Sequence, residues 1–144
     1  MKISKIPLFI LVILLCVSCN NSKKEEKTTE KTKVITQEFC FLNEYRFPDS
    51  TENIDILKLD IQIKGDSVTG NYNWLPALKD QRNGRLIGTI QDKTINATYT
   101  YMQEGIQEIA DITIILADDK AIVTGDSPDS GLDTEVAKIP CNAK

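Results

Sequence analysis

The chain of 144 residues contains no histidine, and this absence removes several classes of enzyme at once. Without histidine it cannot build a Ser-His-Asp triad, a Cys-His pair or a His-ligated zinc or copper site. What remains is chemistry by carboxylates. No two carboxylates can be placed by sequence at the separation that glycoside cleavage requires. We therefore expect a protein that is not an enzyme, with a carboxylate-dependent hydrolase as a further alternative.

Positive charge is scarce in most of the chain. Residues 34–144 carry ten Lys and Arg against eighteen Asp and Glu, whereas residues 20–33 carry five Lys and three Glu. Nucleic acids and anionic membrane surfaces are bound by clustered Lys or Arg, which neutralise phosphates. The acidic body therefore predicts neither kind of partner, and its charge favours solubility.

The chain also lacks a hydrophobic run long enough to cross a bilayer. Its one apolar run, residues 6–18, has thirteen residues, short of the roughly 20 that a spanning helix needs, but suited to a secretory signal. The run ends at Cys19, which follows Val17 and Ser18, whereas Cys16 follows two bulky leucines. This ending resembles the lipobox of bacterial lipoproteins, which implies cleavage before Cys19 and acylation of that cysteine. Ordinary signal cleavage or an uncleaved anchor are the alternatives.

The resemblance divides the chain into three parts. Residues 1–18 are the predicted lipoprotein signal peptide, residues 19–33 the lipidated cysteine and a disordered charged tether, and residues 34–144 a single domain. No apolar residue occurs in residues 20–33, so this segment cannot bury enough surface to offset its chain entropy. Residues 24–26, Lys-Glu-Glu, resemble the export signal of Bacteroidetes-type lipoproteins, although a generic charged spacer explains them equally well. The implied location is the bacterial outer membrane, on its periplasmic face or at the cell surface.

Hydrophobic residues alternate with polar ones through most of residues 34–144, which is the pattern of half-buried strands. Such strands are predicted at residues 34–45, 57–64, 68–74, 86–91, 95–101, 109–117, 121–125 and 135–141. The connections Gly65-Asp66 and Asp92-Lys93 are typical of hairpin turns. We therefore predict an all-β antiparallel meander of about eight strands, closed or nearly closed into a small up-and-down barrel, with a β-sandwich as the alternative.

Cys40 and Cys141 lie near the two ends of the predicted domain. Two thiols in an exported chain usually pair, so we predict a disulfide between them. A closed barrel places its first strand beside its last, which brings the same two residues together. A redox or metal site is disfavoured because these cysteines lack CxxC spacing.

Two sets of residues are candidates for binding. Tyr72, Trp74, Tyr99 and Tyr101 fall at inward positions of neighbouring strands, where they either line the mouth of the barrel and stack on a ligand, or fill its core. The segment 75–84, predicted as a loop, is either a contact surface or a plain connection. The carboxylates of the loop 125–133 do not follow the order of a calcium motif, so we predict neither a metal nor a cofactor.

The motifs GDSVTGNY and GTIQDKTINATYTYMQEG look like parts of small β-rich domains of Bacteroidetes-type lipoproteins to which no activity is assigned. This resemblance covers most of residues 34–141. We therefore expect a membrane-anchored, non-enzymatic envelope lipoprotein whose barrel binds a small ligand or an envelope protein. A structural or assembly lipoprotein with a packed barrel is the alternative.

Overall fold

The computed structural model describes residues 35–49, 52–127 and 131–142. All of them belong to one compact unit, Lys33–Lys144. The predicted signal peptide, Cys19 and the tether lie outside the described residues. In the part that is described, no helix combines the length and the apolar character of a membrane span.

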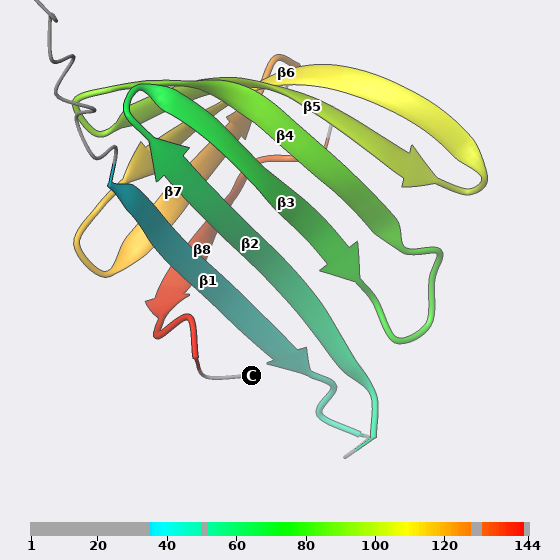
Figure 1. Cartoon of the computed structure of the whole chain (residues 1–144). Helices are drawn as coiled ribbons and strands as arrows, with labels where there is room; N and C mark the ends of the chain where they lie inside the picture. The colour runs from blue at the N-terminus through cyan, green and yellow to red at the C-terminus, as the bar shows by residue number, and fades with distance from the viewer. Residues whose placement is uncertain (1–34, 50–51, 128–130, 143–144) are drawn as a thin grey trace, which may run out of the picture. The chain divides into compact units, whose positions relative to one another are not determined.

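Eight antiparallel strands form a closed up-and-down barrel, in which each strand pairs with the next and the last returns to the first (Figure 1). The strands are β1 (Thr36–Arg46), β2 (Ile54–Lys64), β3 (Ser67–Leu75), β4 (Arg82–Gln91), β5 (Thr94–Gln103), β6 (Ile106–Leu116), β7 (Lys120–Gly125) and β8 (Thr134–Ile139). The predicted all-β meander and its closure are confirmed. The chain does not form the alternative sandwich.

Several predicted strand boundaries were wrong, and β2 begins at Ile54 rather than at residue 57. Strand β4 begins at Arg82, inside the segment 75–84 that was predicted as a loop, and β6 begins at Ile106 rather than at residue 109. Strand β8 ends at Ile139, so Cys141 follows the strand instead of closing it. Polar residues at the ends of β4 and β6 hide the alternation, but backbone pairing with β5 on both sides extends the two strands.

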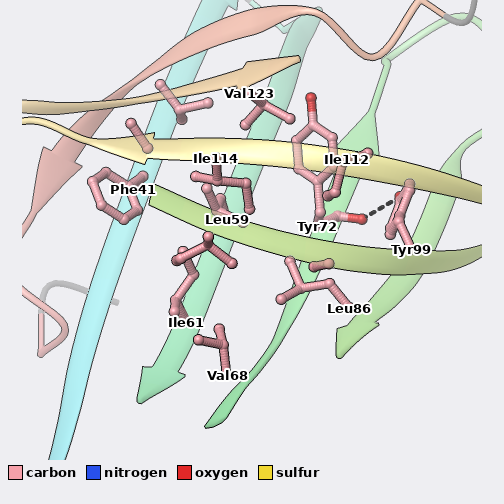
Figure 2. Packing of buried hydrophobic residues seen from close by; sticks show 14 of the residues in the cluster. Phe41, Leu59, Ile61, Val68, Tyr72, Leu86, Tyr99, Ile112, Ile114 and Val123 are labelled. Atoms are coloured by element: carbon pink, nitrogen blue, oxygen red, sulfur yellow. Dashed lines mark hydrogen bonds between the residues drawn. The ribbon is translucent and has the colours of Figure 1, made fainter. Parts of the chain in front are cut away.

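The core is made by the inward side chains of all eight strands. Strand β2 shows the pattern most clearly, because Leu57, Leu59, Ile61 and Ile63 are buried between more exposed neighbours. Figure 2 shows such side chains from β1 to β7 meeting in one cluster. The barrel interior is therefore packed by its own residues, as is usual for eight strands.

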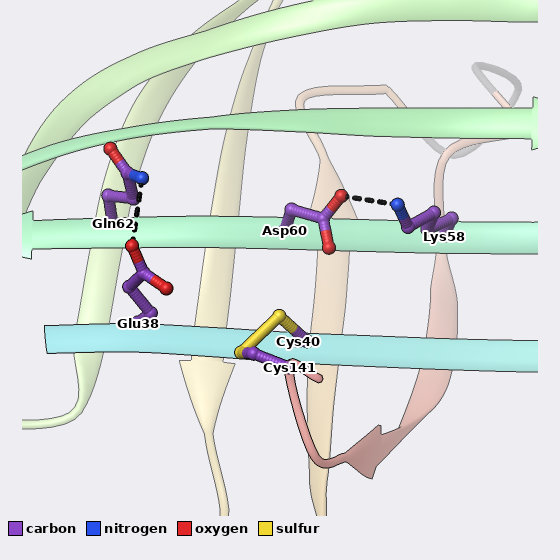
Figure 3. Close-up of a disulfide and its surroundings, with 6 residues drawn as sticks. All are labelled: Glu38, Cys40, Lys58, Asp60, Gln62 and Cys141. Atoms are coloured by element: carbon purple, nitrogen blue, oxygen red, sulfur yellow. Dashed lines mark hydrogen bonds and ion pairs between the residues drawn. A yellow bond between two sulfur atoms is a disulfide. The ribbon is translucent and has the colours of Figure 1, made fainter. Parts of the chain in front are cut away.

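The seam between β1 and β8 is short, because only Cys40 and Phe41 pair with β8. Two further links close it. The Asn43 side chain donates to the Glu135 carbonyl at 2.7 Å and accepts from the Ala137 amide at 2.9 Å, so it continues the hydrogen-bond ladder. The predicted disulfide is present and joins Cys40 to Cys141, with the two Cα atoms 5.1 Å apart (Figure 3).

The two ends of the barrel differ. One, the aliphatic end, has the tight connections 65–66, 92–93 and 117–119. Each connection is bonded to the strand that follows its hairpin, because Ile90, Leu116 and Lys138 donate backbone hydrogen bonds to Asp66, Lys93 and Asp119. Most inward residues of this end are aliphatic: Ile61, Ile63, Val68, Ile90, Ile95, Ile114 and Leu116. Phe39 of β1, opposite Ile61, is an aromatic residue that packs beside them.

The other end, the aromatic end, has the longer connections 47–53, 76–81 and 126–133 and the tight connection 104–105. Its inward residues are Tyr72, Trp74, Arg82, Tyr99 and Tyr101, and Leu132 from the last of these connections is fully buried. The predicted binding residues therefore gather at one end of the molecule.

Candidate functional site

Arg82 is the one charged residue among the buried residues that the structure describes, with 6% of its surface exposed. It opens strand β4 directly opposite Trp74 of β3. Inward positions alternate along β4 from Arg82 through Gly84 to the buried Leu86. The side chain of Arg82 therefore lies on the core side of the sheet because the strand's own period of two carries it there.

Gly84 makes room for the aromatic residues around Arg82. It pairs with Tyr72 of β3 on one side and with Tyr101 of β5 on the other. A Cβ atom at residue 84 would overlap the Tyr99 ring and the base of the Tyr101 side chain. A glycine is needed here because any larger residue would displace these rings.

The three tyrosines pack against one another, and their hydroxyls form hydrogen bonds. The Tyr99 ring stacks on Tyr101, with ring centroids 4.8 Å apart, and lies 5.3 Å from Tyr72. The Tyr99 hydroxyl donates to the Tyr72 carbonyl at 2.5 Å (Figure 2). The Tyr72 hydroxyl donates to the Leu132 carbonyl at 3.1 Å, and the Tyr101 hydroxyl to Glu108 at 2.5 Å. These bonds hold the rings in fixed positions.

The guanidinium of Arg82 lies over the rings of two tyrosines and of Trp74. Its central carbon is 5.9 Å from the centroid of Tyr72, 5.8 Å from that of Trp74 and 5.7 Å from that of Tyr101. One hydrogen bond goes from Nη2 to the Gly131 carbonyl at 3.0 Å, while the buried Nε has no partner among the described residues. Among these residues, no carboxylate forms an ion pair with Arg82. The hydroxyls of Tyr72 and Tyr99 also interact with the Arg82 side chain. The charge is thus compensated by aromatic faces and neutral oxygen atoms.

A cleft of about 370 Å³ opens beside Arg82. It is lined by Tyr45, Leu57, Tyr72, Trp74, Arg82, Gln103, Gly131, Asp133 and Thr134. Asp133, which is exposed, uses one oxygen to accept a hydrogen bond from the Gly125 amide at 2.8 Å. The cleft therefore combines an aromatic wall, a buried cation and a carboxylate at its rim.

Burial governs the acidity of the tyrosines. It raises the pKa of Tyr72 to about 12, an effect that the positive charge of Arg82 opposes. Burial also raises the pKa of Tyr99, and burial together with the Glu108 hydrogen bond raises the pKa of Tyr101. These phenols therefore serve as hydrogen-bond donors at neutral pH and do not supply negative charge to Arg82.

The four predicted aromatic residues have different positions. Tyr72 and Trp74 line the cleft. The ring of Tyr101, on the neighbouring strand β5, contacts the Arg82 guanidinium. Tyr99 is fully buried among the other rings. The two predicted roles, filling the core and lining a binding site, therefore apply to different residues. Tyr72, which is 1% exposed, and Tyr99 fill the core. Trp74 is half-buried and presents part of its surface to the cleft.

The acidic loop 125–133 is described only in part, because residues 128–130 lie outside the described residues. Asp133 closes the turn through the Gly125 amide. Among the residues that the structure describes, no three His, Cys, Asp or Glu side chains are grouped closely enough to hold a metal ion.

A second hollow, of about 430 Å³, lies on the outer surface beside the disulfide and is lined in part by Glu38, Asp60 and Gln62. These three polar residues bond to one another or to a neighbour. Gln62 donates to Glu38 at 3.1 Å, and Asp60 pairs with Lys58 at 2.8 Å (Figure 3). We favour the cleft at the aromatic end, since among the residues that the structure describes it holds the one buried side-chain polar atom without a hydrogen-bond partner.

The sequence analysis included Arg82 in a possible contact loop but missed its burial at the start of a strand. Arg82 was placed in an exposed loop, although the alternation of residues 86, 88 and 90, extended backwards, reaches residue 82 at an inward position. That alternation gives the side on which residue 82 lies within a strand, but not that the strand extends to it.

No protein-family model matches the chain, and no curated protein is significantly similar to it in sequence.

Proposed function

We propose that the protein is a membrane-anchored envelope lipoprotein, held by acyl chains on Cys19, whose barrel binds a small ligand in the cleft at its aromatic end. The observation that carries this proposal is the cleft itself, with Trp74 and Tyr72 on its wall and Arg82 buried beside them. Its volume of about 370 Å³ falls at the small end of the range typical of ligand pockets.

Binding rather than catalysis is proposed from the chemistry of the lining. Asp133 is the one carboxylate among the described residues that line the cleft, whereas carboxylate hydrolases of sugars use two. Arg82 and the protonated tyrosines are donors suited to recognition. They offer no general base near neutral pH.

The alternative of a structural lipoprotein draws support from the packed interior. Residues such as Phe41, Leu59 and Tyr99 leave the centre of the barrel filled. The ligand of the proposed function would therefore bind at the end of the barrel and not inside it. The binding experiment below decides between these functions.

The binding site is tested with the full-length chain in a non-ionic detergent. Trp74 is the sole tryptophan, so its fluorescence reports on the cleft directly. A panel of small amphipathic molecules should include some that change this fluorescence in a saturable way. Gln103→Phe, which narrows the cleft, should abolish the change. Met102→Phe is the matched control, because Met102 is the neighbouring residue and 45% exposed. No saturable response from any member of the panel would favour the structural alternative.

The anchor is tested by metabolic labelling with a fatty acid in a bacterial host. The wild-type chain should carry label and sediment with membranes. Cys19→Ala should remove the label and either release the protein or leave an uncleaved precursor. Cys16→Ala is the matched control and should remain labelled. Full labelling of Cys19→Ala would contradict the proposed anchor.

A further inference from the structure

We infer that the ligand of the cleft is a small anion: a carboxylate or phosphate group, attached to an apolar or aromatic body, that binds the guanidinium of Arg82. This inference rests on the proposed ligand-binding function and names the chemical class of the ligand.

The first step of the argument is the cost of the buried charge. An arginine side chain has five N–H donors and cannot lose its charge in a protein. Among the described residues, the partners of Arg82 are neutral, namely the Gly131 carbonyl and the tyrosine hydroxyls, and its buried Nε has none. Buried charges are normally paired, because an unpaired ion in the interior costs several kcal/mol. A cation whose described partners are all neutral is stabilised when an anion approaches it.

The second step is the position of this cation. Arg82 lines the cleft together with Trp74 and Tyr72, so a molecule that enters meets the guanidinium and the aromatic wall at the same time. Contacts with the three rings also restrict the position of the guanidinium. A planar guanidinium held in this way is pre-organised for the two oxygens of a carboxylate or phosphate.

The third step concerns selectivity. Asp133 lies at the same cleft, and it forms no ion pair with Arg82 in the described structure. Its negative charge opposes the binding of an anion and favours that of a cation. The aromatic and apolar lining must therefore contribute to affinity, which excludes bare inorganic anions as good ligands. Removing the Asp133 charge should tighten the binding of an anion.

The experiment compares four probes that share a phenyl ring: 3-phenylpropanoate, phenyl phosphate, 3-phenylpropanamide and 3-phenylpropylamine. Each is titrated into the full-length chain in non-ionic detergent at constant ionic strength, with Trp74 fluorescence as the readout. We expect at least one anion to bind about tenfold or more tightly than the neutral amide, and the amine to bind most weakly. The order of the two anions identifies the headgroup.

Three variants test the role of Arg82. Arg82→Gln should bind anion and amide equally, while Arg85→Gln, altered on the same strand but on its exposed face, should behave as the wild type. Asp133→Asn, which keeps the oxygen that accepts from Gly125, should bind the anion more tightly. Circular dichroism confirms that each variant is folded. If Arg82→Gln does not fold, the opposite shift of Asp133→Asn still tests the charge.

The outcomes separate this inference from the proposed function. If the amide binds as tightly as the anions, or if Asp133→Asn leaves the anion affinity unchanged, the anionic class is overturned while ligand binding stands. If none of the four probes perturbs Trp74 but other molecules of the panel do, the inference fails alone. If nothing perturbs Trp74, both fail.

Discussion

At the aliphatic end of the barrel, tight turns are each bonded to the next strand and the inward residues are mostly aliphatic. At the aromatic end, three of the four connections are long, and the buried Arg82 has an Nε without a partner among the described residues. The first arrangement satisfies its backbone groups and buries no charge, so it contributes stability. The second keeps a charge in the interior at a cost. This difference indicates that the aliphatic end holds the fold together while the aromatic end serves binding.

The largest expected loss in the free energy of unfolding comes from removing the disulfide at the seam between β1 and β8. Replacing both Cys40 and Cys141 with Ala removes a link across 101 positions of sequence. The chain-entropy model assigns such a link about 4 to 5 kcal/mol. Urea unfolding should show a loss of this size, and the fluorescence of Trp74 and the far-ultraviolet signal should still change together. The reduced wild-type chain should match the double variant. A loss confined to the aromatic end would show that the two ends unfold separately.

The second test weakens the aliphatic end alone. Ile114 is fully buried against Ile95 on the neighbouring strand, so Ile114→Ala should lower the free energy of unfolding by about 2 to 5 kcal/mol. Ligand binding at Trp74 should be unchanged under conditions where the variant is folded. Ile115→Ala, at the adjacent position that is 45% exposed, should cost far less. Equal losses in the two variants would contradict the packed core described above.

A third test uses pH to weaken the aromatic end. The folded chain holds the Tyr72 proton up to about pH 12, whereas an unfolded chain releases tyrosine protons near pH 10. The folded state therefore binds more protons above pH 10, and stability must fall as the pH rises. From about pH 10 to pH 12 the fall from Tyr72 is on the order of 2 to 3 kcal/mol.

Tyr72→Phe should reduce this dependence, because it removes the titrating group and leaves the ring. Urea unfolding of the two proteins at several alkaline pH values measures it. At neutral pH the variant loses the hydrogen bond to the Leu132 carbonyl, worth about 1 kcal/mol. An equally steep decline in both proteins would mean that Tyr72 does not control the alkaline limit.

The two ends also differ in how far the sequence predicts them. At the aliphatic end, strict alternation and turn residues such as Gly65, which has a φ of 67°, determine strands and connections. The disulfide followed from the same topology. At the aromatic end, Arg82 opens a strand within a polar segment, so local composition indicates a loop. Strand β4 extends to residue 82 because Arg82 pairs with Trp74, and because Gly84 pairs with Tyr72 and Tyr101. Such pairing is non-local and is not visible in the residues around it.

The smallest expected effect on stability is the most informative about function. In Arg82→Met, an unbranched apolar side chain replaces the buried cation among the same rings. The variant loses the cation–π contacts and the bond to Gly131, an exposed residue whose carbonyl can bond to water instead. It also loses the cost of burying a charge, and such exchanges are often neutral or stabilising. We therefore expect the free energy of unfolding to change by no more than about 1 kcal/mol, while binding of the anionic probes is lost. A urea titration beside a Trp74 titration measures both. A loss comparable to that of Ile114→Ala would make Arg82 a structural residue and remove the contrast between the ends. A stable variant without binding would show that the chain keeps this charge for its ligand.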